Sequence, residues 1–169
     1  MLDSVVTLLG EMSVLAKGVN PRTSITRLYS AFSSVHACQV DIFEMIERAI
    51  VDGEPLVDIV QLLLHRHAEE NSERIAVLDA VQSILDRGDL GHLHAFFSAL
   101  RAYFEQLPLS GDGAAARALA DAIASSAREP RSLRSRGQLA HAAAVSLLAV
   151  KRGASQVDGA RASIGAATG

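Results

Sequence analysis

Two short stretches of the sequence hold the residue types that could support chemistry. They contain His65, His67, Glu69 and Glu70 in LLHRHAEENSER (63–74), and His92 and His94 in HLHAFF (92–97). Imidazole nitrogens and carboxylate oxygens are ligands of zinc sites, and they also act as general acids and bases. Chemistry would require the surrounding elements to bring three or four of these groups together.

Helix geometry separates the members of each histidine pair. Residues two apart on a helix point about 200° away from each other, so neither His65 and His67 nor His92 and His94 share a face. Residues four apart do share a face, and His65 and Glu69 have this spacing. That pair supplies two ligands at most, whereas a zinc site needs three or four.

The histidine stretch is instead interpreted as a helix end, a turn and a helix start. Protonated His65 and His67 near a helix C-terminus are favoured by the helix dipole. Glu70 and Glu73 are favoured by the same field near the start of a following helix, for which Asn71 is a good N-cap. Antiparallel packing then places the two histidine pairs at opposite ends of a bundle. We therefore predict no catalytic residue, no metal site and no cofactor. A metal-binding protein or enzyme that uses His65 and Glu69 is a remote alternative.

No other catalytic or nucleotide-binding motif occurs in the sequence. A nucleophile elbow, an HExxH zinc motif, a P-loop and a dinucleotide fingerprint are all missing. Cys38 is the single cysteine, so no disulfide can form within the chain. We expect a reducing interior such as the cytoplasm as its location.

Charge is distributed unevenly along the chain. Residues 1–127 hold nine basic and 17 acidic residues, a net charge of −8, and residues 128–169 hold seven basic and two acidic residues, a net charge of +5. The basic residues are concentrated in REPRSLRSR (128–136). Such a segment can contact an acidic protein surface, including that of another copy, or the phosphates of nucleic acid. No aromatic residue lies in 128–169, so base stacking is not available there.

Two alanine-rich segments, 114–127 and 138–150, carry small side chains on more than one face. Either the body of the protein covers this wide apolar surface or another subunit does. The predicted partner-binding residues combine this surface with the basic segment, and they are Arg128, Arg131, Arg134, Arg136, Ala140, Ala143, Ala144, Leu147, Lys151 and Arg152. The favoured function is a non-catalytic helical interaction or assembly protein, with a protein partner or a homo-oligomer. The alternative is a nucleic-acid-associated structural or regulatory protein that binds phosphates through Arg128–Arg136.

Apolar residues recur at helical spacing, and strand-like alternation is nearly absent. This pattern predicts an all-α, single-domain bundle of six to eight helices built from antiparallel hairpins. The helices are expected at about 4–16, 22–52 (one helix, or two with a break near 33–36), 55–67, 72–87, 90–104, 113–127 and 132–151. Phe96, Phe97, Leu100 and Phe104 are expected at the centre of the core.

The chain divides into three predicted segments. Residues 1–107 form an acidic helical core, 108–151 an alanine-rich helical hairpin with the basic segment, and 152–169, which are small and polar, a flexible tail. The longest apolar run, LAHAAAVSLLAV (139–150), falls short of the roughly 18 residues that a membrane span requires. We therefore expect no membrane insertion.

Overall fold

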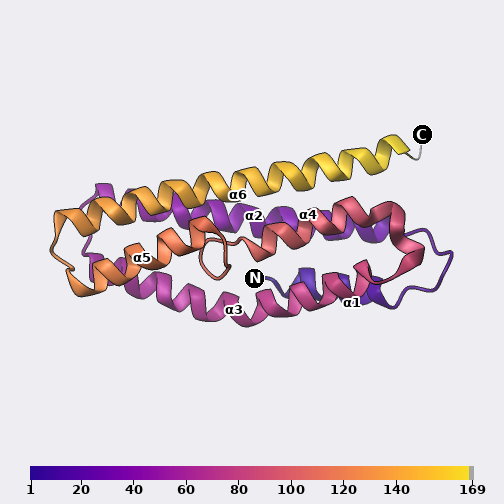
Figure 1. Ribbon diagram of the computed structural model, residues 1–169, viewed down its shortest axis with the longest axis horizontal. Helices are drawn as coiled ribbons and strands as arrows, with labels where there is room; N and C mark the ends of the chain where they lie inside the picture. Colours follow the sequence, from indigo (N-terminus) through magenta and orange to yellow (C-terminus); the bar gives the residue numbers. More distant parts are fainter. Residues whose placement is uncertain (168–169) are drawn as a thin grey trace.

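The fold is all-helical, as the spacing of apolar residues predicts. The computed structural model describes residues 1–167, and within that range it contains no strand. The helices in chain order are α1 (Asp3–Ser13), α2 (Arg22–Val51), α3 (Leu56–Leu85), the 3-10 helix η1 (Gly88–Leu93), α4 (His94–Glu105), α5 (Ala114–Arg128) and α6 (Leu133–Ala167) (Figure 1). Across this described range, none of these helices has the length and apolar character that crossing a membrane requires.

The three long helices, α2, α3 and α6, lie along the length of the molecule (Figure 1). The chain reverses direction between α2 and α3 at one end, and the turn between α5 and α6 lies at that same end. α6 packs along α2, α4 and α5, and α1 packs mainly on α3. The C-terminal third is therefore part of the same compact unit as the rest of the chain.

α2 is one continuous helix, which decides between the two forms that the sequence allowed. Its end is a Schellman motif, in which Gly53 has a φ of +77°. The N–H of Glu54 donates to the carbonyl oxygen of Ala49 at 3.0 Å, and the N–H of Gly53 donates to that of Ile50 at 3.2 Å. Pro55 follows and cannot continue a helix, so the chain turns directly into α3.

α3 is also continuous, so the predicted turn between His67 and Asn71 is wrong. The apolar pattern weakens there because the inward face becomes polar, and the helix does not end. Glu70 and Arg74 are buried on the same stripe as Leu63 and Val77. A gap in the apolar pattern therefore marks a buried polar layer inside one 30-residue helix.

α6 extends well beyond the predicted end near residue 151. Residues 152–167, which we expected to belong to a flexible tail, continue the helix, and residues 168–169 lie outside the described range. The reason is packing: Val150, Ala154 and Val157 are buried at helical spacing against the body. Two polar contacts also join this part of α6 to Tyr29 of α2, a hydrogen bond to Asp158 and the guanidinium of Arg161 over the ring.

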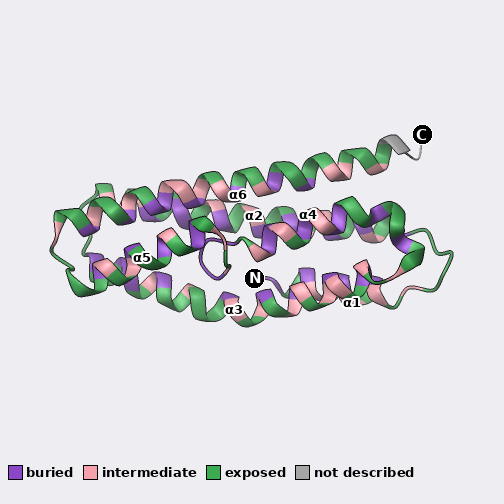
Figure 2. Cartoon of the chain, in the orientation of Figure 1, coloured by how far each residue is buried: buried purple, intermediate pink, exposed green. Residues whose placement is uncertain are grey.

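The centre of the core is where the sequence predicted it. The α4 side chains of Phe96, Phe97, Leu100 and Phe104 are buried. Phe32 of α2 meets Tyr103 of α4 edge to face, with the ring centroids 4.8 Å apart. Buried residues line the inward faces of the helices along the molecule (Figure 2).

Two glycines of α6 give a matched test of this packing. A Cβ atom at Gly153 would lie 2.9 Å from Cδ2 of the buried Tyr103 ring, whereas a Cβ at Gly159 would meet nothing within 4 Å. Replacing a helical glycine with alanine stabilises a helix by about 0.5–1 kcal/mol. We expect Gly159→Ala to raise the free energy of unfolding in urea by about that amount, and Gly153→Ala to give no gain or a loss. Equal gains at both positions would contradict the close approach of α6 and α4.

Candidate functional site

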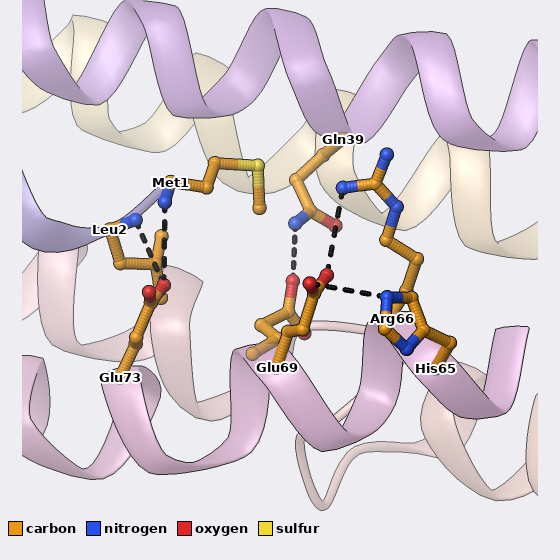
Figure 3. Close-up of polar contacts among 8 residues, drawn as sticks. Met1, Leu2, Gln39, His65, Arg66, Glu69 and Glu73 are labelled. Carbon is orange, nitrogen blue, oxygen red and sulfur yellow. Dashed lines mark hydrogen bonds and ion pairs between the residues drawn. The ribbon is translucent and has the colours of Figure 1, made fainter. Parts of the chain in front are cut away.

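The histidine stretch lies on the exposed side of α3. His65 Nε2 is 3.2 Å from Glu69 Oε1, and Arg66 Nη1 is 3.8 Å from Glu69 Oε2 (Figure 3). The His65 and Glu69 side chains are 69% and 54% exposed, so this is a solvated pair. His67 is not part of this pair, because its Nδ1 lies at hydrogen-bond distance, 2.8 Å, from the carbonyl oxygen of Leu109.

The second histidine pair lies far from the first. His92 is in η1 and His94 begins α4, both beyond the end of α3. The distance along α3 from His67 to Leu85, 18 residue steps, is about 27 Å at 1.5 Å per residue. Among the residues that the structure describes, no three His, Cys, Asp or Glu side chains are arranged as metal ligands.

A buried carboxylate at the middle of α3 is the main polar feature that the sequence analysis missed. Glu70 is 3% exposed, and Gln39 of α2 is fully buried beside it. Gln39 Nε2 donates to Glu70 Oε1 at 2.5 Å, and Ser110 Oγ donates to Glu70 Oε2 at 2.5 Å. Burial raises the pKa of Glu70, while these two hydrogen bonds and the nearby charge of Arg74 act in the opposite direction.

The loop between α4 and α5 places Ser110 beside the Glu70 carboxylate. A Cβ atom at Gly111 would overlap the carbonyl oxygens of Glu105 and Leu107, so only glycine fits this turn. The sequence did contain a signal for the network: Glu70 lies seven residues from both Leu63 and Val77, on the inward face. Reading Glu70 as the acidic start of a new helix hid that signal.

The alanine-rich surface of α6 is covered by the chain itself. Ala143 is fully buried within the molecule, and Ala140, Ala144 and Leu147 are partly buried. α5 contributes small buried residues such as Ala122 to the same contact. Of the two alternatives that the sequence left open for this surface, the contacts agree with coverage by the body of the protein, because the small side chains let α6 approach its own bundle closely.

Arg136 is a structural residue, unlike the other predicted arginines. Its Nη2 donates to the carbonyl oxygen of Ile50 at 2.9 Å, and its Nε donates to the same oxygen at 3.3 Å. The Ile50 carbonyl oxygen also accepts from the N–H of Gly53, and it lies at the negative end of the α2 dipole, where a positive charge is favoured. Arg136 thus caps α2 and fixes the start of α6 beside the end of α2.

Arg128, Arg131 and Arg134 are exposed around the turn between α5 and α6. In the part of the chain that the structure describes, no ion pair or side-chain hydrogen bond involves any of the three. Leu133, between Arg131 and Arg134, is 85% exposed, and so is Val51 at the end of α2. We call these five residues the basic end surface.

Lys151 and Arg152 are exposed but do not join the basic end surface. They lie about 25 Å along α6 from Arg134, at 1.5 Å per residue. The structure therefore brings together only three of the ten predicted partner-binding residues, and it adds Leu133 and Val51, which the sequence analysis did not select.

Comparisons with known proteins found no matching family model, no matching curated protein and no matching solved structure. The geometry and contacts of this chain therefore carry the functional argument.

Glu70→Gln tests the buried carboxylate. Because burial raises the pKa of Glu70, the folded state holds the proton more tightly than the unfolded state. The stability that comes from this tighter proton binding is fully present at pH values below the pKa of Glu70 in the unfolded chain. It is lost as pH rises through the higher pKa of Glu70 in the folded protein. We expect the free energy of unfolding of the wild type, relative to Glu70→Gln, to fall as pH rises from about 4 to about 8.

Urea titrations at several pH values measure this difference in the free energy of unfolding, with the exposed Glu69→Gln as the control. A difference that stays constant or grows with pH would contradict burial of the carboxylate.

Arg136→Met and Arg134→Met separate the structural arginine from an exposed one. Removing the hydrogen bonds to the Ile50 carbonyl should lower the free energy of unfolding by about 1–2 kcal/mol. The same change at Arg134 should stay within about 0.5 kcal/mol of the wild type. Chemical denaturation of both variants measures the contrast, and equal losses would argue against the cap on α2.

Proposed function

We propose that this chain is a non-catalytic helical interaction protein that contacts another protein through the basic end surface. The observation that carries the proposal is the exposure of Leu133 between Arg131 and Arg134, with no partner for these arginines in the described chain. An aliphatic side chain 85% exposed contributes little to the core of its own molecule. Apolar groups combined with arginine are typical of protein interfaces.

The position of these residues also supports a role outside the fold. Arg134 lies in the first turn of α6, where the helix dipole disfavours a positive charge. No acidic residue occupies that turn. Features that weaken local structure without a compensating gain are expected at functional surfaces.

The non-catalytic part of the proposal rests on what the titratable groups already do. His65 pairs with Glu69, and His67 contacts the Leu109 carbonyl. Glu70 is held by Gln39 and Ser110, both of which donate to it. His67 and Glu70 are therefore engaged in contacts between segments of the bundle, and His65 and Glu69 pair with each other on the surface of α3.

Nucleic acid is the alternative partner, since exposed arginines can neutralise phosphates. Leu133 and Val51 favour a protein, because apolar side chains gain nothing from a phosphate backbone. The absence of aromatic residues from 128–169 removes base stacking as a source of affinity.

Chemical cross-linking in nuclease-treated native lysate tests the proposed function. The test variant is Arg128→Ser/Arg131→Ser/Arg134→Ser. A control variant replaces three exposed basic residues elsewhere, Lys17→Ser/Arg22→Ser/Arg117→Ser, and changes the net charge equally. We expect the wild type and the control to capture the same protein, and the test variant to capture about tenfold less.

Three outcomes would contradict the proposal. The first is no captured protein with the wild type. The second is equal loss of capture in both variants, which would indicate an effect of net charge alone. The third is capture that occurs in untreated lysate and is lost after nuclease treatment, with a salt slope of DNA or RNA binding that flattens in the test variant.

A further inference from the structure

A groove between the end of α2 and the start of α3 has the chemistry that complements the basic end surface. Its lining includes the apolar side chains of Met45, which is 38% exposed, and Leu62. The lining also includes three acidic residues, Asp52, Glu54 and Asp58, and one basic residue, Arg48. Within residues 1–167, no ion pair involves any of these three carboxylates. We call this the acidic groove.

The acidic groove and the basic end surface lie at the same end of the molecule. The turns from α2 to α3 and from α5 to α6 both lie there (Figure 1). Arg136, three residues after Leu133, donates to the carbonyl oxygen of Ile50, two residues before Asp52. The two surfaces are therefore neighbours, held at a fixed separation by the cap on α2.

We infer that the partner at this end is a second copy of this chain, bound about a two-fold axis so that Leu133 of each copy enters the acidic groove of the other. Arg131 and Arg134, which flank that leucine, then face the carboxylates that line the groove. This inference rests on the proposed function and names its partner.

Complementarity in both charge and polarity supports a second copy. One surface offers an exposed leucine between two cations, and the other offers apolar side chains with a surplus of carboxylates. In a two-fold dimer the same contact forms twice, and the basic end surface and the acidic groove of each copy are both occupied. Their adjacency at one end lets both contacts form within one small interface of a closed pair.

Charge-swapped variants of the purified protein test this inference. The first variant is Arg131→Glu/Arg134→Glu, which makes the end surface acidic. The second is Asp52→Lys/Glu54→Lys, which makes the groove basic. Asp58 is left unchanged because its carboxylate lies in the first turn of α3, where the helix dipole stabilises it. All substituted side chains are exposed, and unfolding curves check that each variant folds.

Sedimentation velocity and native mass spectrometry give the readout. We expect the wild type to dimerise reversibly and its dissociation constant to rise with salt. Each variant alone should dimerise about 100-fold more weakly, because like charges meet at both contacts. A mixture of the two variants should form a heterodimer with affinity close to that of the wild type, since both contacts then pair opposite charges. Leu133→Ser alone should weaken dimerisation about tenfold.

Each contrary result overturns the inference in a distinguishable way. A wild type that stays monomeric at about 0.1 mM in low salt excludes a second copy as the partner. If the lysate experiment still captures a protein through the basic end surface, the proposed function stands with a different partner. A dimer that tolerates both charge swaps uses another surface. Variants that fail to dimerise alone and also fail to pair with each other rule out the reciprocal contact.

Discussion

The packing of α6 against its own bundle is the constraint on which the rest of the structure depends. Small residues such as Ala143 and Ala154 let this 35-residue helix approach α2, α4 and α5 closely. Because the chain covers this surface itself, the alanine-rich face is unavailable to a partner. What the C-terminal third leaves exposed is the outer side of α6 and the turn before it. The cap that Arg136 makes on α2 fixes that turn beside the acidic groove.

A second constraint acts at the middle of the bundle. The carboxylate of Glu70 joins three segments, because its hydrogen-bond donors come from α2 and from the loop between α4 and α5. A buried charge without such donors is costly, so sliding α2 along α3 by one turn would leave Glu70 without Gln39. The network therefore specifies the register of α2 and α3, in addition to any stability that it contributes.

The sequence predicted the helical class, the central position of Phe96, Phe97 and Phe104, and the break between helices at 52–55, because each depends on local spacing or backbone conformation. The predictions of helix ends were wrong where contacts between helices, and not local spacing, determine how far a helix extends. A polar inward face was mistaken for a turn at Asn71, and a sparse stripe of small residues around Ala154 was mistaken for a tail.

The candidate surface was predictable only in part. The arginines of 128–136 stand out in the sequence, but their separation into a capping residue and three exposed ones depends on where the α2 carbonyl groups lie. Leu133 has no distinguishing pattern in the sequence, because a single leucine beside a helix start is as compatible with burial as with exposure. The acidic groove is assembled from two helices, so no single segment reveals it.

Hydrogen–deuterium exchange of the wild type at low and high protein concentration tests the central claim most directly. We expect strong amide protection across 139–160 at every concentration, because α6 packs against its own bundle along this stretch. Protection that increases with concentration should be confined to the segments around 48–58 and 129–136. Rapid exchange in 152–160, or protection that increases with concentration along the alanine-rich face of α6, would contradict the central claim.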